Sequence, residues 1–330
     1  GRRPEGDVLL GGEGEREESE EGGEAEARHA RRLPQAAAVH GCSVRGPRIR
    51  RAMQGKATEA GASQMQDRPV TDPSAVSPFD ERAATYDETF TRSTIGARMR
   101  AVVWRRLDAA FPAGAHVLEL GCGTGEDAVH LGRRGVSVVA TDPAAAMVRE
   151  TRAKADRAGV GDRVTTRVLD AARIDELGDA RFEGAFSNFG ALNCVADLAP
   201  VSAGLARLVR PGGRVLLCLM GRYVPWEWGW FLVHGPRKSA RRRFEAGGVA
   251  WRGMRVFYPS LRELKRVFAP GFRCTGTRAV GVFVPPSYAE EWARKHPRLL
   301  AALDALERCV EPVPPLPSLA DHVLLELERR

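Results

Sequence analysis

Apolar and polar positions alternate in blocks from residue 94 onward, and the block lengths predict alternating helices and strands. Residues 94–111 place Ile95, Met99, Val103 and Leu107 at helical spacing. Off that stripe lie Arg98, Arg100, Arg105 and Arg106. Short apolar runs with the length of buried strands occupy 116–120, 136–141, 164–169, 182–186 and 214–220. Helices are predicted at 126–134, from Asp142 with Pro143 in the first turn, and at 198–209. This order predicts an α/β fold with a parallel sheet and right-handed crossovers.

The chain after residue 220 departs from this simple alternation. Residues 221–258 are rich in tryptophan and arginine, and we expect them to form an inserted cap. Further strands are predicted at 249–258, 272–284 and 322–327, and helices at 260–268 and 290–309. Four prolines between 312 and 317 predict a stiff connector, so we expect a second insertion over 285–317.

Residues 1–75 lack apolar periodicity and consist largely of glycine, glutamate, alanine and arginine. Such a segment cannot bury enough apolar surface to offset its ordering entropy, so we expect it to be disordered and the folded domain to occupy 76–330. One hypothesis is that translation begins at Met53 or Met65 and that the earlier stretch does not belong to the natural protein. No signal peptide is predicted, because residues 1–30 are charged and have no apolar core.

Composition narrows the class of protein. The longest apolar run, 215–220, is far shorter than a membrane helix, so we expect a soluble cytoplasmic protein. The net charge of +8 comes from arginines spread along the chain and does not by itself predict a nucleic-acid partner. The six cysteines form no Cys-x-x-Cys pair and no cluster with histidine, so reduced thiols are expected and no metal site.

A glycine-rich turn follows the first predicted strand. Glu119 lies near the end of the apolar run, and Gly121, Gly123 and Gly125 follow at alternate positions, with Cys122 between the first two. Glycines at the end of a buried strand let the backbone approach a ligand. The dinucleotide fingerprint requires a glycine where Glu126 stands, and a carboxylate there would repel a pyrophosphate. A nicotinamide oxidoreductase is therefore disfavoured.

Two aspartates stand at the ends of the next predicted strands. Asp142 follows the glycine turn by about 20 residues, where an acid can accept hydrogen bonds from both hydroxyls of a ribose. Its alternative role is to cap the helix ahead of Pro143. Asp170 ends the third strand, and its alternative role is likewise a helix or turn cap.

Together these residues resemble motif I and the following acids of the class I S-adenosylmethionine (SAM)-dependent methyltransferases of the small-molecule type. The resemblance implies a Rossmann-like, doubly wound, mostly parallel seven-stranded sheet with an antiparallel last strand, helices on both faces and a small inserted cap. It implies SAM as the cofactor. The implied cofactor-binding residues are Glu119, Gly121, Cys122, Gly123, Gly125, Asp142, Pro143, Asp170 and Ala171.

Two more segments resemble parts of this family. Residues 79–87 match the pattern Phe-Asp-x-x-Ala-x-x-Tyr-Asp, which implies that Tyr86 lies near the methionine end of the cofactor; alternatively, Phe79 and Tyr86 anchor the first helix. After the fourth strand, Ser187 and Asn188 are implied to touch the methionine part. This loop lacks the Asn-Pro-Pro-Tyr signature of enzymes that methylate adenine amines or protein glutamine. Glu119 is expected to pair with the cofactor ammonium or with an arginine, because an unpaired buried carboxylate is costly.

Substrate selection is expected in the aromatic and basic insertion. The candidates that face the substrate are Phe189, Tyr223, Trp226, Trp228 and His234. The basic run 241–243 and the tryptophans fit an apolar, anionic or lipid-like acceptor and transient contact with a membrane surface. Alternatively, the aromatic residues seal a cap and the arginines are solvated.

The functional hypothesis is methyl transfer from SAM to a small molecule that is apolar or lipid-like. No fixed catalytic residue is expected, because the sulfonium supplies the chemistry and the protein mainly aligns the nucleophile. The alternatives are an RNA or protein methyltransferase and a SAM-binding regulatory module without turnover. The oligomeric state stays open.

Overall fold

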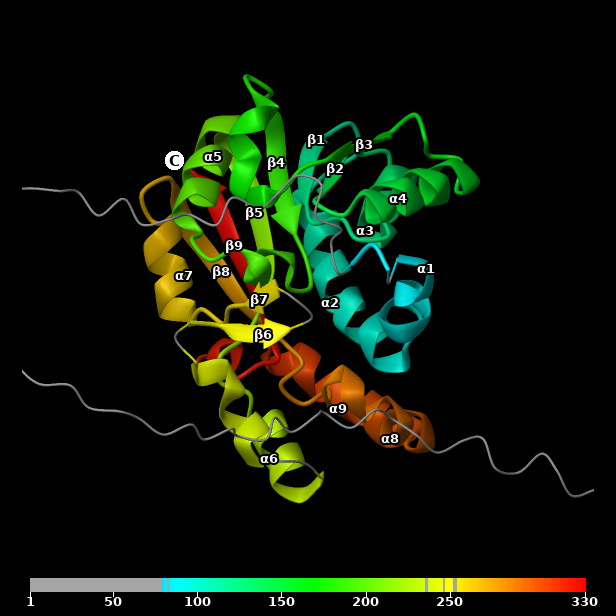
Figure 1. The fold of residues 1–330 in the computed structure, drawn as a ribbon, viewed down its shortest axis with the longest axis vertical. Helices are drawn as coiled ribbons and strands as arrows, with labels where there is room; N and C mark the ends of the chain where they lie inside the picture. Colours follow the sequence, from blue (N-terminus) through cyan, green and yellow to red (C-terminus); the bar gives the residue numbers. More distant parts are fainter. Residues whose placement is uncertain (1–78, 82, 235–236, 246, 252–253) are drawn as a thin grey trace, which may run out of the picture. The chain divides into compact units, whose positions relative to one another are not determined.

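A mixed sheet forms the centre of the described part of the chain, which comprises residues 79–81, 83–234, 237–245, 247–251 and 254–330 of a computed structural model (Figure 1). Within this part, seven strands pair in the order β3-β2-β1-β4-β5-β9-β8. They are β1 (His116–Leu120), β2 (Ser137–Asp142), β3 (Val164–Val168), β4 (Phe182–Ser187), β5 (Val209–Met220), β8 (Phe272–Val280) and β9 (His322–Arg329). Neighbours among β1 to β5 are parallel, whereas β9 is antiparallel to both β5 and β8. The prediction of a mostly parallel seven-stranded sheet with an antiparallel last strand is confirmed.

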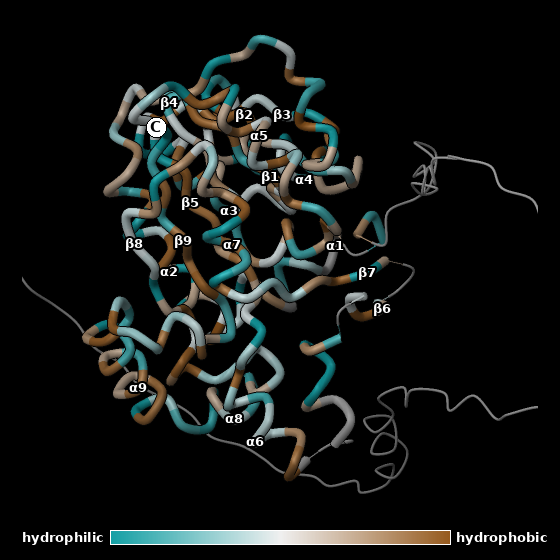
Figure 2. Tube along the Cα trace, turned by 90° about the vertical axis from the view of Figure 1, so that its left-hand side faces the viewer, coloured by the Kyte–Doolittle hydropathy of each residue, from teal (hydrophilic) through white to brown (hydrophobic). Residues whose placement is uncertain are grey.

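Helices cover both faces of this sheet. The longer ones are α2 (Thr94–Ala110), α3 (Glu126–Arg133), α4 (Ala145–Arg157), α5 (Ala199–Leu208), α6 (Pro225–His234), α7 (Leu261–Phe268) and α9 (Pro297–Val310). The shorter ones are α1 (Ala83–Tyr86), α8 (Glu290–Lys295), the π-helical η1 (Asp87–Thr91), and the 3-10 turns η2 (Ala171–Leu177), η3 (Ala191–Cys194), η4 (Arg237–Phe244), η5 (Ser287–Ala289) and η6 (Leu316–Ser318). One core cluster joins α2 and α3 to the sheet, and a second joins α5 and α7 to its other face. Hydrophobic segments accordingly follow the central strands (Figure 2).

Side chains along strand β1 alternate between the two faces of the sheet, and one of them near the carboxyl end is polar. Val117 belongs to the core cluster with α2 and α3, whereas Leu118 and Leu120 belong to the cluster with α5 and α7. Because side chains alternate along a strand, Glu119 lies on the same face as Val117. This buried carboxylate is therefore directed toward the α2 side of the sheet.

Two predicted elements differ from those observed. The expected strand at 249–258 is a separate hairpin of β6 (Val249–Trp251) and β7 (Met254–Val256). The expected helix at 290–309 is divided into α8 and α9 at His296, where the backbone has φ −127° and ψ 56°. Pro297 accounts for the break, because proline disfavours the helical conformation of the residue before it.

The arginines of α2 lie off its apolar stripe, and the structure shows what they do there. Arg98 pairs with Asp304, Arg105 with Glu311 and Arg106 with Glu326. These partners lie on or near α9 and β9, close to the other end of the sequence. Ion pairs therefore join the first long helix to the carboxyl-terminal part of the domain.

The prediction that residues 1–75 are disordered concerns residues outside the described part of the chain. The described residues belong to one compact unit. In this part of the chain, no helix has both the length and the apolar character needed to cross a membrane. The same residues contain no group of three or more metal-ligating side chains placed to hold an ion.

Candidate functional site

The glycine turn at the end of β1 leaves open space at its middle residue. Gly121, Gly123 and Gly125 all have positive φ angles, of 73°, 53° and 80°. A Cβ atom on Gly121 would collide with Ala191, and one on Gly125 would lie 2.6 Å from Thr151 Cγ2. A Cβ on Gly123 would meet nothing within 4 Å. Packing thus accounts for the outer glycines, while the middle one borders a space that a ligand can enter.

Asp142, the last residue of β2, is fixed against this turn. One carboxylate oxygen accepts a hydrogen bond from the Gly123 N–H at 3.0 Å, and the other accepts from the Ala144 N–H at 2.9 Å. Each oxygen keeps a second lone pair, so the group can still accept from a ligand hydroxyl. Burial raises the pKa of Asp142 to about 6, although both backbone hydrogen bonds oppose this shift.

Pro143, Asp170 and Ala171 occupy the neighbouring strand ends. Pro143 is exposed and precedes the cap residue of α4, so it does not form the first turn of that helix as predicted. Asp170 caps η2, because its side chain accepts from the Ala172 N–H at 2.9 Å. Ala171 is the first residue of η2. The alternative capping role is therefore present for Asp170 but not for Asp142, because Ala144 is the cap residue of α4. The adenosine roles of both aspartates stay predictions.

Glu119 presents a buried carboxylate oxygen without a protein partner. The residue is 1% exposed, and its Oε2 atom has no hydrogen-bond partner among the described residues. Burial, with the nearby carboxylates of Asp127 and Asp142, raises the pKa of Glu119 well above its usual range. Among the described residues, no arginine forms an ion pair with Glu119; the buried Arg100 pairs with Asp127 instead. Such an orphaned atom is what a bound ammonium group would satisfy.

Asp127 organises a buried polar cluster beside Glu119. Its Oδ1 accepts from Arg100 Nη1 at 2.5 Å and from Trp104 Nε1 at 2.7 Å, and its Oδ2 accepts from Asn188 Nδ2 at 2.9 Å. Asn188 Oδ1 has no protein partner and is also buried. Ser187, by contrast, donates its hydroxyl to the Leu120 carbonyl at 2.7 Å. The cluster therefore presents Asn188 Oδ1 and Glu119 Oε2 as unused acceptors.

The segment before α2 is tied to the glycine turn. Asp87 accepts from Thr124 Oγ1 at 2.5 Å and from Lys154 Nζ at 2.6 Å, and Lys154 also reaches Glu126. Although burial alone would raise it, the hydrogen bonds from Lys154 and Thr124 hold the pKa of Asp87 below its usual range. Tyr86 stands next to this clamp and packs against the small core cluster that includes Met147.

Cys122 is a packed thiol. It is 7% exposed, and its sulfur lies 3.4 Å from Thr151 Oγ1. Burial, with nearby Asp142 and Glu119, raises the pKa of this thiol well above its usual range. A thiol in these surroundings is a poor nucleophile.

Phe189 lies at the carboxyl end of β4 with a φ of 50°, a conformation that is costly for a bulky residue. The Arg100 guanidinium carbon lies 4.8 Å from the centre of its ring. Phe90 and His322 meet the ring edge-on, with centroids 5.2 and 5.7 Å away. Phe189 is thus held between the polar cluster and the first residue of β9.

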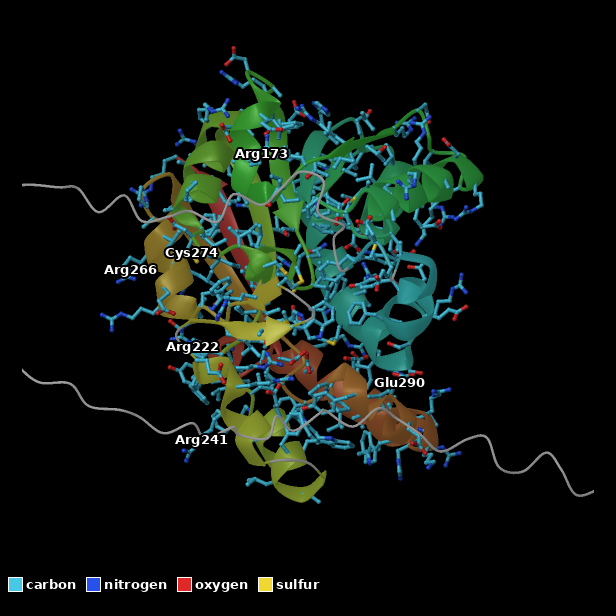
Figure 3. All side chains as sticks on the ribbon, in the orientation of Figure 1. Arg173, Arg222, Arg241, Arg266, Cys274 and Glu290 are labelled. Atoms are coloured by element: carbon cyan, nitrogen blue, oxygen red, sulfur yellow. The ribbon has the colours of Figure 1, made fainter. Side chains whose placement is uncertain are left out.

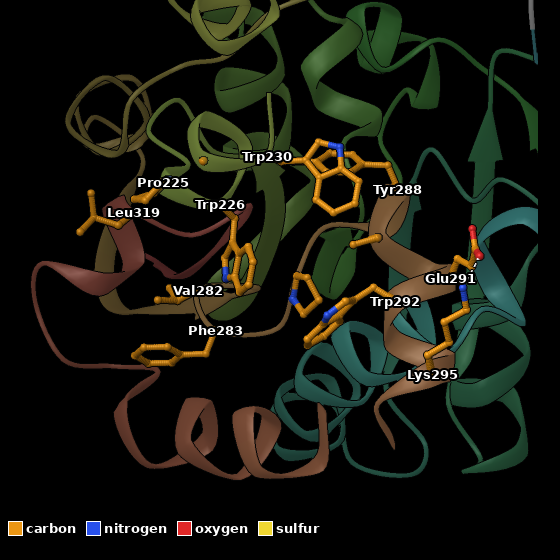
Figure 4. Close-up of a pocket in the computed structure, with 13 residues that line it drawn as sticks. Pro225, Trp226, Trp230, Val282, Phe283, Tyr288, Glu291, Trp292, Lys295 and Leu319 are labelled. Carbon is orange, nitrogen blue, oxygen red and sulfur yellow. Dashed lines mark hydrogen bonds and ion pairs between the residues drawn. The ribbon is translucent and has the colours of Figure 1, made fainter. Parts of the chain in front are cut away.

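An aromatic cavity of about 890 Å³ lies among α6, η5, α8 and the segment that follows β8 (Figure 4). Its aromatic lining residues are Trp226, Trp230, Phe283, Tyr288 and Trp292. The described charged residues that line it are Glu291 and Lys295, which pair with each other at 2.6 Å. The space therefore suits an apolar molecule of moderate size.

The predicted substrate-facing residues divide into separate groups. Trp226 lines the cavity, whereas Tyr223 and Trp228 pack against Phe244 with centroids 5.6 and 6.1 Å away. The side chain of His234 lies outside the described part of the structure.

Most of the basic run is not solvated. Arg242 and Arg243 both bind the buried carboxylate of Glu227, and Arg243 also binds Asp321. Arg241 alone of the three is exposed and points away from the domain (Figure 3). These pairs give the arginines a structural role in closing the cap.

The sequence interpretation missed several residues of this site. Arg100 was noted only as lying off the stripe of α2, yet it is buried because it pairs with Asp127. Trp230, Tyr288 and Trp292 were within predicted insertions but were not singled out. A count of aromatic residues over 285–317 would have identified the last two. No local pattern marks Asp127 or His322.

Comparisons with known proteins show which kind of domain this chain resembles. Residues 117–213 match the model of a family described as a methyltransferase domain. The chain is 32% identical over 140 residues to a demethylmenaquinone methyltransferase of Clavibacter sepedonicus, covering 42% of this chain and 55% of the relative. It is 32% identical over 109 residues to an S-adenosyl-L-methionine-dependent Diels-Alderase of Talaromyces variabilis, covering 33% and 37%.

A solved structure of geranyl diphosphate C-methyltransferase from Streptomyces coelicolor A3(2) has a TM-score of 0.49 and 15% identity, covering 79% of this chain and 86% of that one. Among the curated relatives, the chain spans only 55% of the length of the demethylmenaquinone methyltransferase and 37% of the length of the Diels-Alderase.

Proposed function

We propose that this chain, which carries a class I SAM-dependent methyltransferase domain, transfers a methyl group from SAM to a small apolar acceptor. The observation that carries the proposal is the position of Asp142, whose carboxylate is fixed beside the open face of Gly123. Cofactor and acceptor sites then lie at the same carboxyl edge of the sheet, which is where such sheets bind ligands.

The residues present fit the cofactor. Asp142 would accept from the ribose hydroxyls, and the unused Glu119 Oε2 and Asn188 Oδ1 would accept from the ammonium of the methionine part. When bound, SAM would supply an activated methyl group on a sulfonium. The protein's own contribution is to orient the acceptor and exclude water.

The acceptor would lie in the aromatic cavity. Its described walls are apolar or aromatic apart from one ion pair, so charged macromolecules and anionic molecules are poorly matched. The commitment of Arg242 and Arg243 to buried carboxylates removes the patch on which RNA binding would rest. An uncharged small molecule therefore fits better than RNA or a protein.

The test begins with SAM affinity measured by isothermal titration calorimetry. Asp142→Asn should weaken binding by about 10- to 100-fold, because hydrogen bonds to a charged group contribute about 1.5–3 kcal/mol. Asp162→Asn is the matched control, since Asp162 is exposed and lies outside the site. Equal affinity of both variants would contradict the cofactor assignment.

The second step identifies the acceptor. Wild-type protein is incubated with methyl-labelled SAM and a metabolite extract, and labelled products are separated by mass. We expect label in an apolar small molecule. Tight SAM binding without any labelled product would instead favour a regulatory module.

A further inference from the structure

A histidine and an aspartate lie side by side where β9 begins. His322 is 7% exposed and Asp321 6%, and His322 Nδ1 lies 3.0 Å from Asp321 Oδ2. No hydrogen bond of His322 Nε2 is found among the described residues. His322 Nδ1 is buried and makes no hydrogen bond within the described residues, so the Asp321 carboxylate adjoins the imidazole without a hydrogen bond to it.

The position of His322 joins the two halves of the proposed site. It pairs with Met220 and Val280, the last residues of β5 and β8. The chain that follows these strands supplies Pro225, Val282 and Phe283 to the wall of the cavity. On its other side, the imidazole meets the ring of Phe189, which lies over Arg100. His322 thus lies between the aromatic cavity and the polar cluster.

The charged groups that surround His322 pair with one another. Arg243 forms ion pairs with both Asp321 and Glu227, and Arg242 also pairs with Glu227. Two carboxylates thus meet two guanidiniums and impose no net charge on the ring. Across Phe189, the charge of Arg100 is matched by Asp127. A general base must be unprotonated before it acts.

Other ionisable groups near this position are weaker candidates. Burial, with Glu227 and Asp321, raises the pKa of Tyr288, which lines the cavity. Burial raises the pKa of the Cys218 thiol on β5 to about 12. Both groups therefore hold their protons at neutral pH. Asp321 remains ionised, because Arg243 and His322 hold its pKa far below its usual range although burial opposes them.

We propose that His322, which lies beside Asp321 at the start of β9, is the general base that takes the proton of a weakly acidic hydroxyl on an apolar acceptor. The inference rests on the proposed methyl transfer. His322 Nε2 takes the hydroxyl proton, and the oxygen's electron pair forms the bond to the methyl carbon. The carbon–sulfur bond breaks with its electron pair on sulfur, leaving a neutral thioether. The imidazolium then returns its proton to solvent.

Two acceptors that differ in acidity test this role. 4-Nitrophenol ionises near neutral pH, whereas 2-naphthol ionises only in alkaline solution. At about pH 8, His322→Gln should lower kcat with 2-naphthol by about 10²- to 10⁴-fold. With 4-nitrophenol, which already carries the negative charge, the loss should be less than about tenfold, and raising the pH should restore the rate with 2-naphthol.

The control is His116→Gln, at the amino end of β1 and therefore at the opposite edge of the sheet. SAM affinity and thermal unfolding are measured for both variants, and His322→Asn is used if the glutamine variant does not fold. An equal loss with both phenols, or no loss with 2-naphthol, overturns the proposed base.

A further comparison separates this inference from the proposed function. If wild-type protein methylates neither phenol but labels a metabolite that has no hydroxyl, the base and its acceptor class are wrong and methyl transfer stands. If wild-type protein labels nothing in either experiment, the proposed function itself fails.

Discussion

At the scale of single residues, burial controls what the carboxylates of this site can do. Asp142 is 7% exposed and is held by two backbone N–H groups, yet its pKa lies about 2 units above the ordinary 3.8. The folded protein therefore binds this proton more tightly than the unfolded chain does. Its contribution to folding stability is present below pH 3.8 and is lost as pH rises toward 6.

This shift predicts a pH dependence of cofactor binding. The ionised Asp142 accepts hydrogen bonds better than the protonated one, so SAM affinity should be constant well above pH 6 and should fall as pH is lowered through about 6. Calorimetry between pH 5 and 8, a window of about one to two units on each side of the pKa, measures this. In Asp142→Asn the fall near pH 6 should disappear; if it persists, another group controls binding.

Asp127 predicts a large effect on stability. Asp127→Asn leaves the Arg100 guanidinium, which is 6% exposed, without a counter-charge. The free energy of unfolding should fall by about 3–5 kcal/mol, measured by urea denaturation. The matched change Asp156→Asn removes an exposed pair with Arg152 and should cost less than about 1 kcal/mol. Similar values for the two variants would contradict the buried role of Asp127.

At the scale of elements, helix α9 holds a wall of the cavity through one carboxylate. Glu307 accepts from the N–H groups of four consecutive residues, Gly281, Val282, Phe283 and Val284, at 2.5 to 3.1 Å. Two of these residues line the cavity. In the same way, Glu290 of α8 accepts from the N–H groups of Thr94 and Ile95 at the start of α2 (Figure 3). Buried or half-buried acids thus accept hydrogen bonds from backbone N–H groups of segments that are distant in the sequence.

Glu307→Gln should therefore loosen the cavity wall. An amide has one acceptor oxygen and places N–H donors against backbone donors, so we expect a loss of about 1–3 kcal/mol in unfolding free energy. The KM for the acceptor should rise while SAM affinity stays unchanged. Glu245→Gln, at an exposed position in the cap, is the control. An equal rise of the SAM Kd would show that the effect is general unfolding.

At the scale of the whole molecule, the predicted cofactor edge and the aromatic cavity are built by different parts of the chain. The former comes from β1, β2 and β4 with their following turns, and the latter from α6, α8 and the segment after β8. Ion pairs between α2 and the carboxyl-terminal residues join the amino-terminal and carboxyl-terminal parts of the domain. The two ligands should therefore respond to different substitutions.

Trp292→Leu tests this separation. Removing an indole that lines the cavity should raise the acceptor KM several-fold, because apolar contact area is lost, and should leave the SAM Kd within about twofold. Tyr223→Leu truncates an aromatic residue that packs against Phe244 away from the cavity, and it should change neither constant. Initial-rate kinetics with calorimetry distinguish the outcomes; a larger effect of Tyr223→Leu would place the acceptor elsewhere.

The strands of the sheet and the turn at Gly121–Gly125 could be predicted because residues close together in the sequence determine each of them. Apolar runs indicate buried strands. Pro297 is visible in the sequence and explains why residues 290–309 form two helices instead of the one predicted. The prediction of one strand over 249–258 was wrong although Gly253 lies within it, because a single glycine in a strand pattern also fits a bulge. Tyr223 and Trp228 are grouped with Trp226 only by proximity in sequence. Trp226 and Trp228 are two residues apart on α6 and therefore face different directions, and Tyr223 precedes that helix.

The sequence by itself determined the order of strands and helices, the glycine turn and the acids at the strand ends, because burial and backbone conformation act over a few neighbouring residues. Only the tertiary structure decided which arginine meets which acid. Arg243 and Asp321, or Glu307 and the residues after β8, are distant in the chain, and fifty basic and forty-two acidic side chains offer many equivalent pairings. The position of His322 between cavity and polar cluster is set in the same way, by the pairing of β9 with β5 and β8.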